Sequence, residues 1–98
     1  MPAAYVIAEI EITHPEGYKE YTTMVPATIQ KHGGRFLVRG GKSQVLEGEW
    51  PERRRVIIEF PSWEAARKWW DSPDYEKPKS LRRANSNGRL LLIEGPSS

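Results

Sequence analysis

The architecture follows from residues 4–34, which read AYVIAEIEITHPEGYKEYTTMVPATIQKHGG. Residues 4–12 alternate between two kinds of side chain with the two-residue period of a β-strand. Beyond Thr13 the spacing becomes helical, and one stripe is formed by Tyr18, Tyr21, Val25, Ile29 and His32. The stretch therefore predicts a strand followed by an amphipathic helix that ends at Gly33-Gly34.

Local signals indicate where this helix begins and ends. Thr13 and Glu16 have the spacing of a capping box, so we expect Thr13 to be the N-cap. Pro26 lacks an N–H group and crowds the preceding turn, so it is expected to kink the helix. One of the two glycines, Gly33 or Gly34, is expected to adopt the left-handed conformation that ends many helices.

The rest of the sequence continues the alternation of strands and helices. Strands are predicted at residues 35–39, 54–60 and 89–93, with residues 43–47 as a candidate continuation of the first. Gly40-Gly41 indicates a bulge or bend, and residues 48–52 and 85–88 are predicted turns. Helical segments are expected to begin with Ser62 as an N-cap and at Ser72-Pro73-Asp74, where Pro78 is expected to interrupt the second one.

The element order βαββαβ predicts an α+β fold of the ferredoxin-like type. Right-handed crossovers give a four-stranded antiparallel sheet in the order 4-1-3-2, with the helices packed on one face. The 98 residues correspond to a single domain, 1–98, with its core over about residues 4–95 and a C-terminal tail over residues 96–98. The four Trp, four Tyr and two Phe indicate a second buried surface beyond this thin core.

Composition excludes several classes of protein. Because there is no cysteine, disulfides, thiolate catalysis and cysteine-ligated metals are excluded. His14 and His32 fall at opposite ends of one predicted helix, so no metal site is expected. No segment approaches the roughly 20 apolar residues of a membrane helix, no targeting segment is recognised, and a cytoplasmic location is expected. The net charge of +2 is small and the aromatics do not interleave with a basic stripe, so nucleic acid is not an expected partner.

The sheet face away from the helices mixes apolar and charged residues. The helices are expected to cover Val6, Ala8, Ile10, Val56, Ile58 and Phe60, which leaves a second face of Tyr5, Ile7, Glu9, Glu11, Leu37, Arg39, Arg55, Ile57 and Glu59. A solvated sheet carries fewer Ile and Leu, whereas a dry core carries no Glu. The mixture is typical of a half-buried surface, such as a cleft closed by a second subunit. An ordinary hydrated face is the alternative.

Several motifs resemble one bacterial family. They are HGGRFLVRGG at 32–41, LEG at 46–48, RVIIEFPS at 55–62, Trp70, SPDY at 72–75 and EG at 94–95. Over about residues 4–95 the sequence resembles the family known as domain of unknown function 1330. Pro78 is a departure, because such sequences usually have a continuous helix in that segment.

This resemblance implies a dimeric α+β barrel, in which two ferredoxin-like subunits pack sheet against sheet with a cleft in each. The wider superfamily includes cofactor-independent monooxygenases, lactone isomerases, haem-dependent peroxidases and ligand-sensing domains. The family has no settled reaction, so no catalytic role carries over to this sequence.

Two residues are candidate catalytic groups. His32 is either a general base that reaches the cleft from the helix end or a C-terminal histidine favoured by the helix dipole. Arg39, beside Gly40 and Gly41, is either the holder of an anionic group or one half of an ion pair with a strand glutamate. In the first case the glycines let a ligand approach the backbone.

Five further residues are candidate ligand contacts: Tyr21, Glu9, Glu59, Trp70 and Tyr75. Tyr21 offers a phenol, although a tyrosine on an amphipathic stripe is usually a core residue. Trp70 and Tyr75 either roof the cleft or pack the interior. Glu9 and Glu59 form either an acid–base pair in a half-buried site or ion pairs with Arg39 or Arg55.

Two functions follow from this reading. The first is a homodimer that binds a small organic molecule in a cleft between the sheet and the helices of each subunit, without turnover. The second is a cofactor-independent monooxygenase or isomerase, with His32 as the base and Arg39 steadying a developing oxyanion. Neither function requires a cofactor, and none is expected.

Overall fold

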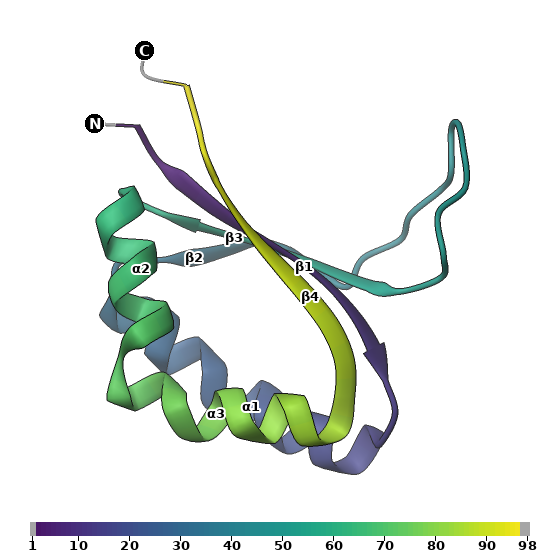
Figure 1. Ribbon diagram of the computed structural model, residues 1–98, viewed down its shortest axis with the longest axis horizontal. Helices are drawn as coiled ribbons and strands as arrows, with labels where there is room; N and C mark the ends of the chain where they lie inside the picture. Colours follow the sequence, from purple (N-terminus) through teal and green to yellow (C-terminus); the bar gives the residue numbers. More distant parts are fainter. Residues whose placement is uncertain (1, 97–98) are drawn as a thin grey trace.

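The computed structural model describes residues 2–96 as one antiparallel sheet with three helices on one of its faces (Figure 1). The elements in chain order are β1 (Ala4–Ile12), α1 (Pro15–Lys31), β2 (Arg35–Arg39), β3 (Arg54–Phe60), α2 (Trp63–Asp71), α3 (Pro73–Asn85) and β4 (Ser86–Glu94). The strands lie in the order β2-β3-β1-β4, which is the predicted order read from the opposite edge. The ferredoxin-like fold is therefore confirmed. Within residues 2–96 no helix combines the length and the hydrophobicity needed to span a membrane.

The core lies between the sheet and the helices. The predicted inner face is buried, with Val6, Ala8, Ile10, Val56, Ile58 and Phe60 all packed beneath the helices. Trp69 of α2 and Tyr75 of α3 are fully buried at its centre, with ring centroids 4.2 Å apart. The Trp69 indole donates a hydrogen bond of 3.0 Å to the Thr28 hydroxyl, so α2 is fixed to α1 by a satisfied polar contact.

Two predicted helix ends are correct and one is wrong. Gly33 has a φ of 78° and ends α1, and the Ser62 hydroxyl accepts the hydrogen bond that caps α2. The capping box at Thr13 is wrong, because His14 is the N-cap of α1 and no side chain caps this end. Pro15 in the first turn needs no such partner, since it has no N–H to satisfy.

The last third of the chain is more regular than predicted. α3 continues through Pro78, which is fully buried, so the expected interruption is wrong. The missing N–H removes a single bond of the helix, and the packing around the ring is retained. The predicted turn at residues 85–88 is also wrong, because α3 ends at Asn85 and β4 begins at Ser86.

The connection between β2 and β3 differs from the prediction. Residues 43–47 form no strand, and residues 40–53 form an arm that stands away from the sheet on the side opposite the helices (Figure 1). The register shift lies between Phe36 and Val38, before Gly40-Gly41. Gly40 itself makes a bend, with a φ of 70°.

This bulge moves Arg39 to the other face of the sheet. Phe36 pairs with Ile58, and beyond the bulge Arg39 pairs with Val56, so both lie on the helix-covered face. The predicted position of Arg39 on the second face is wrong. The extra residue, Leu37, inverts the alternation of β2, since side chains change face at every residue.

Candidate ligand-binding site

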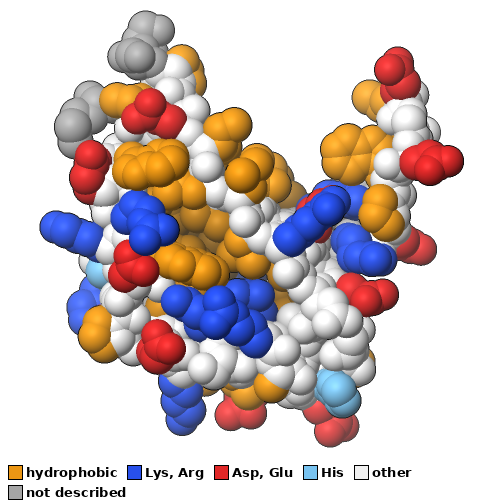
Figure 2. Space-filling view, viewed as in Figure 1, with side chains coloured by type: hydrophobic (Ala, Val, Ile, Leu, Met, Phe, Trp, Pro, Cys, Tyr) orange, Lys and Arg blue, Asp and Glu red, His pale blue; other side chains and the backbone are white. Residues whose placement is uncertain are grey.

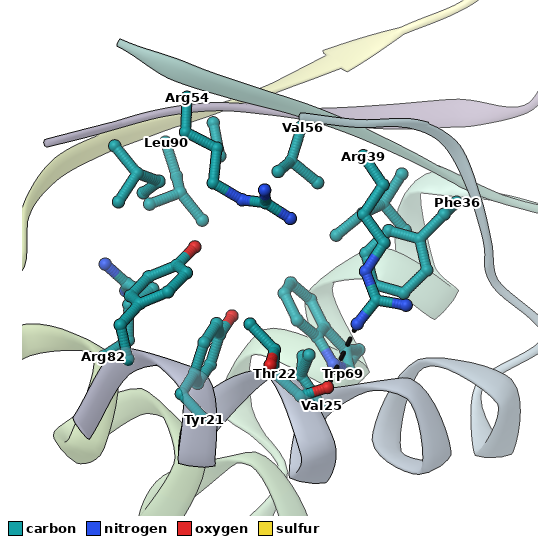
Figure 3. A pocket seen from close by; sticks show the side chains of 14 residues that line it. Tyr21, Thr22, Val25, Phe36, Arg39, Arg54, Val56, Trp69, Arg82 and Leu90 are labelled. Atoms are coloured by element: carbon teal, nitrogen blue, oxygen red, sulfur yellow. Dashed lines mark hydrogen bonds between the residues drawn. The ribbon is translucent and has the colours of Figure 1, made fainter. Parts of the chain in front are cut away.

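A small cavity lies between the middle of the sheet and α1 (Figure 3). Its volume is about 30 Å³, which is room for one or two water molecules. Most of its wall is apolar, from Ala8, Ile10, Val25, Phe36, Val56, Ile58, Trp69 and Leu90. Its polar side chains are Tyr18, Tyr21, Thr22, Arg39, Arg54 and Arg82. An apolar wall with a few convergent polar groups is the kind of lining that small-molecule sites have, but this cavity is about a tenth of their usual volume.

Arg39 closes one end of the cavity. Its guanidinium lies 4.3 Å from the ring centroid of Phe36 and donates a hydrogen bond of 3.0 Å to the backbone carbonyl of Thr22 in α1 (Figure 3). The side chain therefore spans from β2 to α1 and is held by a cation–π contact and a backbone acceptor.

Arg54 extends from the start of β3 into the cavity (Figure 3). Its Nε is buried and has no hydrogen-bond partner within the described residues. Its guanidinium carbon lies 6.0 Å from the centroid of the Tyr18 ring. Gly40 makes room for this group, because a Cβ at that position would collide with the guanidinium.

Arg82 enters from α3 and is 4% exposed. Its Nε donates to the Tyr75 hydroxyl at 3.4 Å, and that hydroxyl lies 3.1 Å from the hydroxyl of Tyr21. Burial raises the pKa of the Tyr21 phenol, and burial likewise raises the pKa of Tyr18. Both phenols therefore stay protonated at neutral pH and act as hydrogen-bonding groups rather than as bases.

The cavity has an excess of positive charge. Its lining contains Arg39, Arg54 and Arg82 and no Asp or Glu. Across residues 2–96, every ion pair joins other residues, so none of these three arginines has a carboxylate partner there. Of the three, Arg82 is buried, Arg54 is partly buried and Arg39 is exposed. A buried cation without a counter-ion is costly, which distinguishes Arg82 from the surface ion pairs of the chain.

The structure brings two of the predicted site residues to the cavity. Tyr21 and Arg39 line it, and Tyr75 lies directly behind Tyr21. His32 is the C-cap of α1, about two turns beyond Val25, and is not part of the lining. Gly40 and Gly41 contribute to the base of the arm rather than to the cavity.

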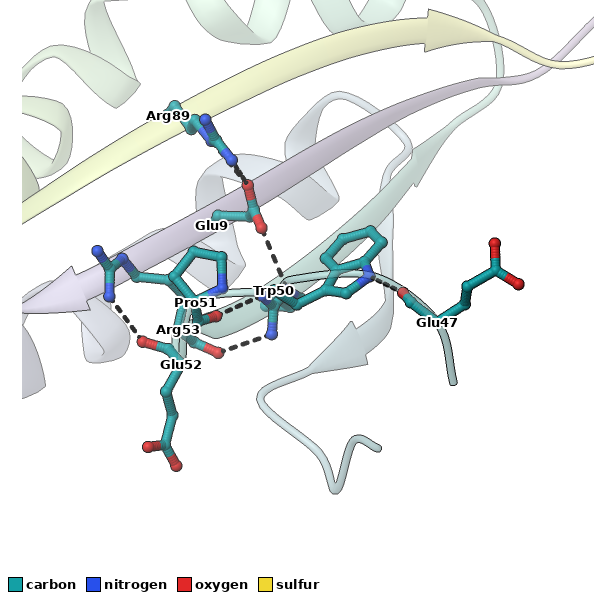
Figure 4. Close-up of polar contacts among 8 residues, drawn as sticks. Glu9, Glu47, Trp50, Pro51, Glu52, Arg53 and Arg89 are labelled. Atoms are coloured by element: carbon teal, nitrogen blue, oxygen red, sulfur yellow. Dashed lines mark hydrogen bonds and ion pairs between the residues drawn. The ribbon is translucent and has the colours of Figure 1, made fainter. Parts of the chain in front are cut away.

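Glu9 and Glu59 lie on the opposite face of the sheet, where arginines hold them. Glu9 accepts hydrogen bonds from Arg89 at 2.7 Å and from Arg55 at 3.2 Å (Figure 4), and Glu59 accepts one from Arg35 at 2.8 Å. Arg89, and to a lesser extent Arg55, hold the pKa of Glu9 below its usual range. Of the two alternatives predicted for Glu9, an acid–base pair or an ion pair with Arg39 or Arg55, the structure shows the ion pair with Arg55.

Sequence reasoning missed four polar residues of the cavity: Tyr18, Thr22, Arg54 and Arg82. A signal existed for two of them. Arg54 has the same parity as Val56 and Ile58, which predicts the inner face, although it stands within a run of three arginines that resembles a solvated surface. Arg82 follows Tyr75 at a spacing of seven along α3, which places both on one helix face.

A larger groove adjoins the cavity between α2 and β4. It has a volume of about 250 Å³ and shares Trp69 and Leu90 with the cavity. Figure 2 shows this hollow from outside as an orange surface with basic side chains along part of its rim. Trp70 forms one wall, and the Lys79 ammonium lies 4.1 Å from the centroid of its ring. The predicted contact residue Trp70 therefore lines the groove rather than the cavity.

Residues 3–96 match the family described as domain of unknown function (DUF1330). This chain belongs to the DUF1330 family. The match covers the motifs from which the sequence predicted it. No protein of curated function matches the chain.

Solved structures share the fold of this chain. A protein of unknown function from Rhodopseudomonas palustris is 19% identical, with a TM-score of 0.78 over 99% of this chain and 85% of that one. A dimeric ferredoxin-like protein of unknown function from Jannaschia sp. is 12% identical, with a TM-score of 0.68 over 96% and 98%. SnoaB, a cofactor-independent oxygenase from Streptomyces nogalater, is 13% identical, with a TM-score of 0.66 over 100% and 97%. At these identities the likeness establishes the fold and leaves activity to be argued from the site.

Proposed function

We propose that this DUF1330 protein is a homodimer that binds a small organic molecule between the sheet and the helices of each subunit. The observation that carries the proposal is the convergence of Tyr21, Arg54 and Arg82 on one apolar-walled cavity. These side chains come from three separate elements, α1, β3 and α3, and a merely structural core does not need polar groups from each of them.

The outer face of the sheet supports the dimer. Leu91 and Ile93 of β4 are 60% and 47% exposed there, in register with Ile7 and Tyr5 of β1. Glu9 is already neutralised by Arg55 and Arg89, so burial of this face would not leave its carboxylate unpaired. A second copy, packed sheet against sheet, would cover the apolar side chains and retain the ion pairs.

The arm supplies a second reason to expect a partner copy. Leu46 is 91% exposed, and Val45 and Trp50 are each more than half exposed on the same segment. Trp50 is held by a bond of 3.1 Å from its indole to the Glu47 carbonyl (Figure 4). An apolar segment that stands beyond the outer face is positioned to extend the same interface over a second subunit.

Binding without turnover agrees better with the cavity than catalysis does. A cofactor-independent oxygenase or isomerase needs a group that accepts a proton from its substrate. The described lining has phenols, guanidiniums and a hydroxyl but no imidazole or carboxylate. The oxygenase alternative rests on the shared fold with SnoaB, and in it Arg39 or Arg54 would stabilise the developing oxyanion.

Native mass spectrometry of protein purified under gentle conditions tests the proposal. The expected species is a dimer that carries the mass of a small molecule, which is lost on denaturation and can be identified in the extract. A monomer at micromolar concentration would contradict the dimer. If the protein is an oxygenase, adding the released compound back to the purified protein should consume dioxygen. If the protein only binds the compound, no dioxygen should be consumed.

A further inference from the structure

We propose that the ligand is an amphipathic organic anion, a small carboxylate or an equivalent group on an apolar body. Its anionic group binds between Arg54 and Arg82 in the cavity, and its body lies in the groove between α2 and β4. This inference rests on the proposed function and specifies the chemistry of the molecule that is bound.

The charge of Arg82 has no counter-ion among the described residues. Arg82 is a buried residue, yet its described side-chain hydrogen bond is the one of 3.4 Å from its Nε to the Tyr75 hydroxyl. A guanidinium has five N–H donors in a rigid fork, and a neutral phenol satisfies one of them without compensating the charge. An anion in the cavity would supply a stronger acceptor for this fork and the opposite charge that the described contacts of Arg82 do not provide.

Arg54 lines the same cavity as Arg82. Its unpartnered Nε is buried in the wall of the same cavity, so a donor without an acceptor is present where the anion is proposed. Phenols at Tyr18 and Tyr21 stay protonated and add neutral hydrogen-bond donors. With no Asp or Glu in the lining, no side chain of the cavity competes with an anion for these donors.

The cavity and the groove differ in size. About 30 Å³ admits a group the size of a carboxylate but not a whole organic ligand. The groove of about 250 Å³ shares Trp69 and Leu90 with the cavity and is walled by Ala66, Trp70 and Leu92. Such walls favour an aryl or short alkyl body, which would lie against Trp70.

The test uses isothermal titration calorimetry with phenylacetate, 3-phenylpropionate and 4-phenylbutyrate. Their chain lengths sample different separations between the anionic group and the ring, and each is compared with its neutral amide, which has nearly the same shape. We expect at least one carboxylate to bind about tenfold or more tightly than its amide, since charge-assisted bonds to guanidinium are stronger than neutral ones.

Variants locate the anion. Arg54→Gln should reduce the affinity of the best carboxylate to that of its amide, whereas Arg53→Gln, the neighbour that pairs with Glu11 and does not line the cavity, should leave it unchanged. If Arg82→Gln folds, it should lower the affinity for the best carboxylate as Arg54→Gln does. If Arg82→Gln does not fold, the affinity of Arg54→Gln alone tests the inference. Circular dichroism of each variant verifies the fold.

Three results would overturn the inference, and none of them coincides with failure of the proposed function. Equal affinity for carboxylates and amides, or no measurable affinity for the whole series, would reject the anion. So would a carboxylate affinity that Arg54→Gln leaves intact. The proposed function fails separately, through a monomer or an empty dimer in native mass spectrometry.

Discussion

The hydroxyl groups of Tyr21 in α1 and Tyr75 in α3 lie 3.1 Å apart in the buried interior, and Arg82 donates to the second of them. Tyr75 is fully buried and Tyr21 is 8% exposed, so water has little access to either oxygen. The pair therefore joins two helices and one arginine of the proposed site. Its loss should affect both the stability of the domain and the position of Arg82.

Tyr75→Phe leaves the Tyr21 hydroxyl and the Arg82 Nε without their partner, whereas Tyr21→Phe leaves the Tyr75 hydroxyl with Arg82 as its remaining partner. We expect each to lower the free energy of unfolding by about 1–3 kcal/mol, because an unsatisfied buried group costs more than a satisfied one contributes. The double variant should cost less than the sum of the two, with a coupling of about 0.5–1.5 kcal/mol. Urea unfolding of all four proteins measures it, and strict additivity would show that the two hydroxyls do not interact.

Gly40 and Gly41 form a matched pair of positions. Gly40 has a φ of 70°, and a Cβ there would collide with the Arg54 guanidinium, so Gly40→Ala should destabilise the protein by about 1–2 kcal/mol. It should also weaken binding of the carboxylate probes by displacing Arg54. Gly41→Ala meets no atom within 4 Å and serves as the control. If the two substitutions weakened carboxylate binding equally, the claim that Gly40 affects binding through the position of Arg54 would be rejected.

Stability should decrease in acid partly through Glu9. Arg89 and Arg55 lower the pKa of Glu9 in the folded protein below its ordinary value of 4.5. The contribution of these ion pairs to the free energy of unfolding is therefore complete above pH 4.5. As the pH falls below that value the unfolded chain binds the proton first, and the contribution is lost as the pH passes through the lowered folded pKa. Unfolding free energies measured from pH 6 to pH 3 should fall less steeply in Glu9→Gln. Parallel curves would contradict the ion-pair account.

The dimer can be tested by placing a charge on the outer face. Leu91 is 60% exposed in one subunit, so Leu91→Glu should leave the subunit folded. In a sheet-to-sheet dimer the new carboxylate would be buried without a partner, and light scattering after gel filtration should detect the monomer. Ala27→Glu, on the exposed side of α1, should remain dimeric. A dimeric Leu91→Glu protein would exclude β4 from the interface.

Sequence patterns predicted the strand order and the buried face because periodicity is local. Alternation in residues 4–12 and 54–60 was enough to assign Val6 and Val56 to the core, as the structure confirms. The site was harder to predict, because a single extra residue at Leu37 inverted β2 and moved Arg39 across the sheet. Nothing in the sequence locates such a bulge, and the glycines at 40–41 suggested a later position.

Arg54 and Arg82 show a different limit. Both are long basic residues next to other arginines in sequence, and Arg53, Arg55 and Arg83 have ordinary surface or ion-pair roles. Whether a given arginine is buried depends on the packing of helices against the sheet. Their common orientation toward one cavity becomes evident only when α1, β3 and α3 are placed together.

The central claim is that each subunit binds a ligand between its sheet and its helices, and amide and indole chemical shifts of the labelled protein test it directly. With the tightest-binding of the three carboxylates added, we expect saturable shifts at the Trp69 indole and at the amides of Tyr21 and Val56. Shifts confined to the outer face or to the arm, with the Trp69 indole unchanged at saturation, would contradict the account.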